Sequence, residues 1–272
     1  MTPPPDGLYR TAPQPLSLLG RLLPSATFFA TLFGIVWRAS RVAKAGRYDD
    51  DAWRGDSIKV LHALESVGVR FDVTGLERLA AVDGPCLIVG NHMSTLETMI
   101  LPGLVVPYRR VTFVVKQSLM DYPIFRYIMR SRHPIAVSQK NPREDLKAML
   151  TQGTARLAEG VSVIVFPQGT RMGEFRRAEF NTIGVKLALR GGVPILPLAL
   201  STAAWPMGRW ISDLARIHRD RIVRMDFGPP IAVQGRGEAE HQAIVEFVES
   251  RLQMWGDAVG EITPESPTRN VE

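Results

Sequence analysis

The sequence predicts an α/β fold in which helices cover a layered, mainly parallel central sheet. Short apolar runs alternate with longer segments of helical periodicity, as in proteins whose parallel strands are joined through helices. Two runs, residues 87–90 and 161–166, are apolar at nearly every position, which is typical of strands buried on both faces. Polar side chains follow such runs at His92, Lys116 and Arg171, and ligands in open α/β sheets bind beyond the carboxyl ends of the strands.

Four segments are predicted along the chain. Residues 1–20 contain five prolines and are expected to form a disordered lead. Residues 21–68 are expected to form apolar or amphipathic N-terminal helices, and residues 69–259 the α/β domain. Residues 260–272 are expected to form a disordered tail.

Residues 22–37 carry no charged side chain, but the run is shorter than the roughly 20 residues that span a bilayer. Basic residues flank it at Arg21, Arg38, Arg41, Lys44 and Arg47. No small-x-small cleavage site follows the run, so a signal peptide is not favoured. We expect a helix that lies in the membrane surface with its basic flank on anionic headgroups. The alternative is a buried amphipathic helix that covers the core.

The remaining elements follow from periodicity and from their end signals. Three aspartates open a helix over residues 49–68, and no second ligand cluster accompanies them to favour a metal site. Pro142 occupies a favoured first-turn position, and Gly191-Gly192 ends a helix. Strands are predicted over residues 69–73, 87–90, 111–115, 135–138, 161–166, 193–200 and 221–227. Further helices are predicted over residues 96–104, 118–130, 142–158, 178–190 and 237–255.

Composition narrows the class of protein. The net charge of +6 suits nucleic acid, an anionic membrane surface or an acidic substrate. The single cysteine, Cys86, cannot form an intrachain disulfide, and its apolar surroundings favour a core residue over a nucleophile. The sequence contains no G-x-S-x-G, P-loop, strand-linked G-x-G-x-x-G, H-E-x-x-H or C-x-x-C motif. Their absence disfavours hydrolases, NTPases, Rossmann oxidoreductases and zinc enzymes.

His92 is the strongest candidate for a catalytic base, because imidazole exchanges a proton near neutral pH. Glu97 lies five positions later, where it can orient the ring if His92 precedes the helix. The segment from Ser94 to Glu97 also matches a capping box, in which Glu97 accepts a hydrogen bond from the first backbone amide. The spacing leaves both roles open.

A second polar cluster follows the strand at residues 161–166. Backbone amides at Gly169 and Thr170 can face an anion, and the Arg171 guanidinium can bind a phosphate through two donors. Gln168 adds a neutral donor and acceptor, and Lys116 offers a second positive charge. A base at one strand end and an anion site at another indicate group transfer onto a phosphorylated acceptor.

Three motifs resemble those of the glycerolipid acyltransferases, the family of 1-acyl-glycerol-3-phosphate and lysophospholipid acyltransferases. Residues 91–97, Asn-His-Met-Ser-Thr-Leu-Glu, resemble the N-H-x4-D block. Residues 166–171, Phe-Pro-Gln-Gly-Thr-Arg, resemble the F-P-E-G-T-R block, and residues 193–198 look like the V-P-I-x-P block. Order and spacing agree with the family over about residues 70–230.

The resemblance implies the glycerolphosphate acyltransferase fold with a membrane-associating N-terminal helix. His92 would take the proton of the acceptor hydroxyl, and Glu97 would orient His92. Arg171, Gly169 and Thr170 would hold the acceptor's phosphate with help from Lys116, and Asn91 and Gln168 would join the substrate-binding set. The donor would be acyl-CoA or acyl carrier protein, with no metal, cofactor or acyl-enzyme.

The implied activity is O-acylation of a lysophospholipid, above all 1-acyl-glycerol-3-phosphate, in phospholipid biosynthesis on the cytoplasmic face of the cell membrane. Three departures from the family pattern put the acceptor in question. Glu97 and Gln168 stand where the family has Asp and Glu, and Ser138-Gln139 stand where it has Asp-Arg. An acyltransferase for a different lyso-lipid, or a catalytically weak lipid-binding or scaffold protein on the same fold, are the alternatives.

Nucleic acid is not an expected partner. The basic stretch lacks the interleaved aromatic residues that stack on bases, so a solvated basic face near lipid headgroups is preferred. Its members are Arg209, Arg216, Arg219, Arg221 and Arg224.

Overall fold

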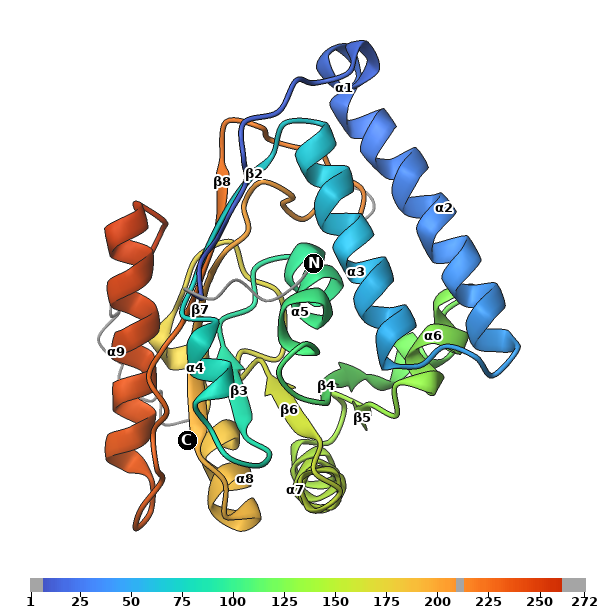
Figure 1. Ribbon diagram of the computed structural model, residues 1–272. Helices are drawn as coiled ribbons and strands as arrows, with labels where there is room; N and C mark the ends of the chain where they lie inside the picture. Colours follow the sequence, from blue (N-terminus) through green and yellow to red (C-terminus); the bar gives the residue numbers. More distant parts are fainter. Residues whose placement is uncertain (1–6, 209–212, 261–272) are drawn as a thin grey trace, which may run out of the picture.

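The computed structural model describes residues 7–208 and 213–260. Within them, eight strands form one sheet in the order β1-β2-β8-β7-β3-β6-β4-β5 (Figure 1). Their bounds are β1 Tyr9–Arg10, β2 Arg70–Thr74, β3 Leu87–Gly90, β4 Val111–Lys116, β5 Ile135–Val137, β6 Ser162–Val165, β7 Ile195–Ser201 and β8 Ile222–Phe227.

Strands β7, β3, β6, β4 and β5 run parallel to one another. Strand β8 is antiparallel to β7, β2 is parallel to β8, and β1 is antiparallel to β2. The carboxyl ends of the five parallel strands therefore lie at one edge of the sheet. The predicted mixed α/β fold with a mostly parallel central sheet is confirmed.

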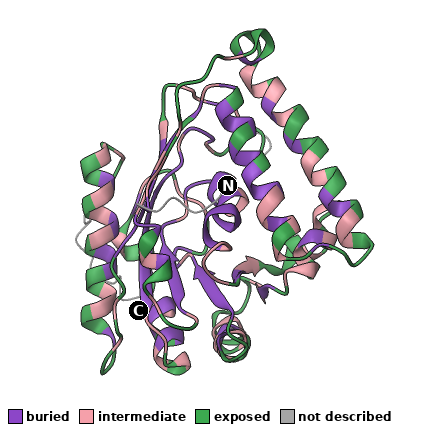
Figure 2. Cartoon of the chain, viewed as in Figure 1, coloured by how far each residue is buried: buried purple, intermediate pink, exposed green. Residues whose placement is uncertain are grey.

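Helices cover both faces of the sheet, and their buried sides face it (Figures 1 and 2). One apolar core includes Leu61 of α3 and Ile100 of α5, and the other includes Leu187 of α8 and Val248 of α9. The helices are α1 Leu18–Leu22, α2 Pro24–Lys44, α3 Asp50–Ser66, α4 Glu77–Ala80, α5 Thr95–Val105, α6 Phe125–Ser131, α7 Pro142–Ala158, α8 Ile183–Gly191 and α9 Glu238–Trp255, with short 3-10 turns η1 Gln117–Met120 and η2 Arg177–Glu179.

Two predicted helices have different bounds in the structure. The helix expected over residues 118–130 is divided into η1 and α6, because Pro123 and the positive φ of Ile124 (68°) interrupt the backbone between them. The helix expected from residue 178 begins only at Ile183. Asn181 fixes this start, since its side-chain oxygen accepts from the Ile183 N–H at 2.9 Å.

The prediction of a disordered lead is wrong for residues 7–20. Strand β1 pairs with β2, and the hydroxyls of Tyr9 and Thr11 donate to the Glu65 carboxylate of α3 at 2.7 and 2.6 Å. These partners lie more than 50 residues away along the chain, so local composition gives no sign of them. Residues 1–6 and most of the predicted tail, residues 261–272, lie outside the described residues, as does Arg209 of the basic stretch.

Helix α2 is amphipathic rather than fully buried. Phe28 and Leu32 pack into the core, whereas Phe33 and Trp37 are 60% and 50% exposed and stack on each other at 6.0 Å between ring centroids. Across residues 7–208 and 213–260, no helix combines the length and apolarity needed to cross a bilayer.

Candidate active site

The candidate site lies where β3, β6 and β7 end. Gly90 closes β3 and lies so near β7 that a Cβ atom on it would meet the Leu198 carbonyl oxygen at 2.5 Å. Only glycine allows this approach of two backbones. The Asn91-His92 pair therefore leaves the sheet directly beside the end of β7.

Asn91 continues the pairing of β3 with β7 through its side chain. Its amide nitrogen donates to the Leu200 carbonyl and its oxygen accepts from the Leu200 N–H, both at 2.8 Å. The residue is 1% exposed. The predicted contact between Asn91 and substrate is wrong, because both polar groups of the side chain already bind β7. Asn91 fixes the backbone from which His92 projects.

His92 is held on four sides. Its ring stacks on Phe166 at 4.4 Å between centroids, and its Nδ1 lies 2.9 Å from Glu97 Oε1. Its backbone N–H donates to Gln168 Oε1 at 2.7 Å, and its carbonyl accepts from the Met172 N–H at 2.8 Å. Nε2 forms no hydrogen bond to any residue of the described chain, and the side chain is 17% exposed. This nitrogen is therefore open to a ligand.

Glu97 performs both roles that the spacing left open. Its Oε1 accepts from His92 Nδ1 and from the backbone amides of Met93 and Ser94 at 2.6 and 2.7 Å. Its Oε2 accepts from the hydroxyls of Ser94 and Thr202, each at 2.8 Å. The capping box is complete, and the same carboxylate also orients the imidazole.

The charge state of Glu97 follows from these contacts. Burial raises the pKa of this fully buried carboxyl. The hydrogen bond from His92, the charge of His92 and the hydrogen bond from the Ser94 amide lower the pKa by a larger amount, so the net pKa is below the ordinary value. An ionised carboxylate can only accept, so His92 Nδ1 must donate. The Nε2 lone pair of the neutral ring is then the one that faces outward.

Gln168 braces His92 and is 8% exposed. This bond gives Gln168 Oε1 a positioning role, and the contact of Gln168 with substrate stays a prediction. Gly169 has a φ of 70° and turns the chain, with its N–H bonded to the Phe166 carbonyl at 3.0 Å. Gln139, which stands where the family has Arg, donates to the Gly169 carbonyl at 2.7 Å. Thr170 is exposed at the rim of this turn.

Arg171 lies on the α5 side of the site, and its guanidinium is already engaged. Its Nη1 donates to the Thr95 hydroxyl and lies 2.5 Å from Asp213 Oδ1. Thr95 in turn donates to the same Asp213 oxygen at 2.5 Å. Burial raises the pKa of Asp213, but the donors from Thr95 and Arg171 outweigh it, so the net pKa is lowered and the carboxyl is ionised.

Lys116 ends β4, and the pairing of β4 with β6 brings this strand end to the same edge as the loop that follows β6. Lys116 is exposed at the end of β4, and β6 separates β4 from β3. Its ammonium has no hydrogen bond or ion pair with the described part of the chain, so it stands at the rim as a solvated charge.

Three further residues contribute to the site and were not predicted from the sequence. Phe166 stands in a recognised motif, but nothing in the motif says that its ring stacks on His92. Thr202 directly follows the apolar run of β7, which is a usable signal because that run ends at the same edge as β3. Asp213 has no such signal, since it lies 42 residues beyond Arg171 in an irregular connection.

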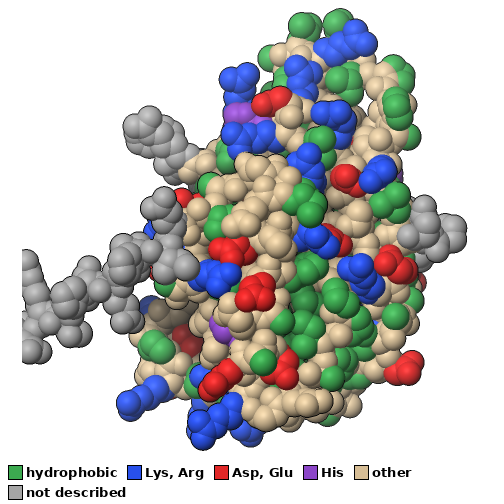
Figure 3. Space-filling view, turned by 90° about the vertical axis from the view of Figure 1, so that its left-hand side faces the viewer, with side chains coloured by type: hydrophobic (Ala, Val, Ile, Leu, Met, Phe, Trp, Pro, Cys, Tyr) green, Lys and Arg blue, Asp and Glu red, His purple; other side chains and the backbone are tan. Residues whose placement is uncertain are grey.

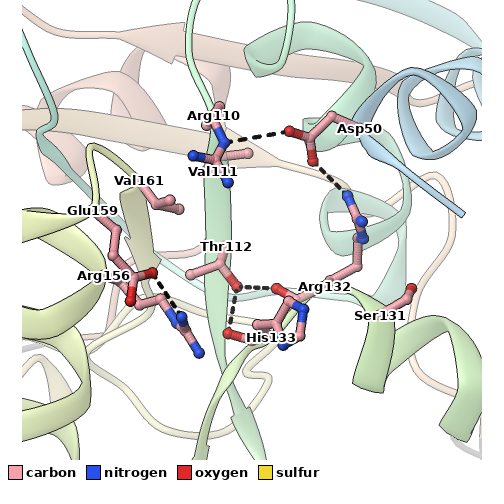
Figure 4. A pocket seen from close by; sticks show the side chains of 10 residues that line it. All are labelled: Asp50, Arg110, Val111, Thr112, Ser131, Arg132, His133, Arg156, Glu159 and Val161. Carbon is pink, nitrogen blue, oxygen red and sulfur yellow. Dashed lines mark hydrogen bonds and ion pairs between the residues drawn. The ribbon is translucent and has the colours of Figure 1, made fainter.

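A cavity of about 270 Å³ lies at the opposite edge of the sheet, where β4 and β6 begin (Figure 4). The charged side chains that line the cavity form ion pairs with one another: Asp50 with Arg132 at 2.5 Å and Arg156 with Glu159 at 2.8 Å. The cavity is therefore separate from the His92 site, and the charges around it are largely satisfied.

The chain is similar to known acyltransferases. Residues 70–201 match the family model described as Acyltransferase. The chain is 32% identical over 199 residues to the 1-acyl-sn-glycerol-3-phosphate acyltransferase of Pseudomonas aeruginosa, and the match covers 72% of each protein. It is 30% identical over 129 residues to a chloroplastic 1-acyl-sn-glycerol-3-phosphate acyltransferase of Brassica napus, covering 47% of this chain and 36% of that protein.

The fold is similar to that of a solved structure. The crystal structure of the 1-acyl-sn-glycerophosphate acyltransferase PlsC from Thermotoga maritima superposes with a TM-score of 0.64 at 22% identity. The superposition covers 89% of this chain and 98% of that one.

Proposed function

The chain belongs to the family of 1-acyl-sn-glycerol-3-phosphate acyltransferases. We propose that it transfers an acyl group onto 1-acyl-glycerol-3-phosphate, with His92 as the base and Arg171 as the residue that binds the phosphate. The acyl donor is a thioester of coenzyme A or of acyl carrier protein, which acts as co-substrate. The reaction needs no resident cofactor or metal in this proposal.

His92 Nε2 takes the proton of the acceptor's free hydroxyl as its oxygen attacks the thioester carbonyl. The positive charge that forms on the imidazole faces the ionised Glu97 at 2.9 Å, which stabilises it. The tetrahedral intermediate collapses as the C–S bond breaks. The thiolate leaves without a strong acid, and the proton on Nε2 passes to it or to solvent.

Arg171 binds the acceptor's phosphate, with the Gly169 and Thr170 backbone beside it and Lys116 at the rim. Two observations support this assignment. The Arg171 guanidinium lies at the same edge of the sheet as His92, and a guanidinium can donate two parallel hydrogen bonds to phosphate oxygens. The ion pair of Arg171 with Asp213 affects how tightly the guanidinium can bind this phosphate.

The N-terminal helices associate with the membrane surface in this proposal. Leu18, Leu19, Leu22 and Leu23 are 57–71% exposed, and the exposed Phe33-Trp37 pair continues this apolar surface along α2. Hydrophobic and basic side chains lie side by side at the end of the molecule that α1 forms (Figure 3). An apolar face next to cations suits anionic headgroups, and the enzyme would act on the cytoplasmic side of the cell membrane.

The observation that carries the proposal is the open Nε2 of a histidine whose Nδ1 is fixed by a buried carboxylate. The test measures acyl transfer from acyl-CoA and from acyl carrier protein to 1-acyl-glycerol-3-phosphate and a panel of other lysolipids. We expect transfer by the wild type and little by His92→Ala. Lysolipid binding without turnover, unchanged by His92→Ala, would instead identify a lipid-binding protein.

A further inference from the structure

The Arg171 guanidinium holds an anion that belongs to the chain itself. Asp213 Oδ1 receives two donors, Arg171 Nη1 and the Thr95 hydroxyl, both at 2.5 Å. An arginine fork and a hydroxyl donor are the groups that a bound phosphate oxygen would use. The carboxylate therefore occupies the position in which the proposed acceptor's phosphate would lie.

The contact with Asp213 leaves other N–H donors of the Arg171 guanidinium free to bind a ligand. The hydrogen bonds of Arg171 to described residues involve Nη1 alone. A phosphate monoester carries about −1.5 to −2 charges on three terminal oxygens, so it can engage two guanidinium nitrogens where Asp213 engages one. A phosphorylated acceptor can thus outcompete the internal carboxylate.

The carboxylate can leave without disturbing the backbone that carries it. The Asp213 carbonyl accepts from the Trp205 indole N–H at 3.1 Å, and Trp205 is 1% exposed and packs edge-on against Phe28 of α2 at 5.0 Å. The Asp213 side chain is 52% exposed, so it has solvent into which to turn. The backbone is anchored, whereas the side chain is held by its two donors.

We infer that Asp213 is a specificity-determining residue that competes with the acceptor's phosphate for Arg171. This inference rests on the proposed function of Arg171. Asp213 raises the KM for phosphorylated acceptors and weakens the binding of free phosphate, and it leaves the chemical step at His92 unchanged.

The kinetic test uses Asp213→Asn in the full chain, which keeps the shape of the side chain and removes its charge. An exposed ion pair of this kind changes affinity by about two- to fivefold. We expect the KM for 1-acyl-glycerol-3-phosphate to fall by that factor while kcat stays within about twofold, and the KM for an uncharged monoacylglycerol to stay unchanged. Asp220→Asn, at an exposed position on the same connection between β7 and β8, is the control for net charge.

Two results would overturn the inference. An unchanged KM would mean that Asp213 does not compete, and a raised KM with a lower Tm would mean that Asp213 only holds its segment in place.

A binding measurement separates this inference from the proposed function. Inorganic phosphate is titrated calorimetrically into the wild type, Asp213→Asn and Arg171→Met. We expect Asp213→Asn to bind phosphate two- to fivefold more tightly than the wild type and Arg171→Met to lose binding. Equal affinity in the wild type and Asp213→Asn refutes competition, whether or not acyl transfer is found. Acyl transfer that is absent while the affinities differ refutes only the proposed function.

Discussion

Replacing Glu97 by glutamine separates its electrostatic role from its structural one. Three donors converge on Oε1: His92 Nδ1 and the amides of Met93 and Ser94. The oxygen of a glutamine amide can accept all three. The amide nitrogen would then take the place of Oε2 and donate to the hydroxyls of Ser94 and Thr202, which can rotate to accept. Glu97→Gln should therefore keep the ring orientation and lose only the charge.

The magnitude follows from that difference. A hydrogen bond to a charged group contributes about 1.5–3 kcal/mol and a neutral one about 0.5–1.5 kcal/mol. Losing the charge should therefore cost about 1–2 kcal/mol in the transition state that places a proton on His92. This corresponds to a fall in kcat/KM of about 5- to 30-fold. The free energy of unfolding should change by no more than about 2 kcal/mol, because the cap is retained.

The assay compares kcat/KM for acyl transfer by the wild type, Glu97→Gln and Glu97→Ala, together with urea unfolding. Glu97→Ala leaves the buried amides of Met93 and Ser94 without an acceptor and should be both less stable and less active than Glu97→Gln. Activity of Glu97→Gln within twofold of the wild type would refute the electrostatic role and leave Glu97 as a cap. A loss of about 10⁴-fold in a folded Glu97→Gln would refute the argument that the ring orientation survives.

Three further perturbations test other parts of the structure. The pKa of Glu97 is lower in the folded than in the unfolded chain, so its ionised form stabilises the fold above the unfolded pKa, and that stabilisation is lost as pH falls through the folded pKa. The unfolding free energy of the wild type should therefore fall on acidification relative to that of Glu97→Gln, which urea titrations from neutral to acidic pH measure. Gly90→Ala should destabilise by about 1–3 kcal/mol in urea unfolding, because its Cβ would meet the Leu198 carbonyl at 2.5 Å; wild-type stability would contradict the close approach. Trp37→Glu should reduce cosedimentation with anionic vesicles, whereas Met254→Glu, at an apolar position on α9 that is 69% exposed, should not; equal effects would refute membrane docking by α2.

The strand ends were predictable because they depend on local pattern. Apolar runs that stop at Gly90 and Phe166 mark where β3 and β6 leave the sheet, and parallel pairing brings their ends to one edge. The structure accordingly places His92 beside the loop that contains Gly169. The ordering of residues 7–20 was missed because it depends on Glu65 and on pairing with β2.

Side-chain direction explains the error at Asn91. Asn91 stands in the first motif, but its amide turns inward and binds Leu200 of β7. In the second motif, Gln168 Oε1 accepts from the His92 backbone N–H, a contact that the motif does not predict. Order along the chain does not reveal which way a side chain points. Thr202 and Asp213 reach the site from beyond β7, so their contributions depend on tertiary structure that no local pattern encodes.

The central claim is that His92 Nε2 is the base for acyl transfer. The most direct measurement is kcat/KM for acyl transfer to 1-acyl-glycerol-3-phosphate by wild type and His92→Ala, with folding checked by circular dichroism. A positioned general base contributes about 10²–10⁴-fold, so we predict a loss of that size in the folded His92→Ala. A folded His92→Ala that transfers acyl groups as fast as the wild type would contradict the claim.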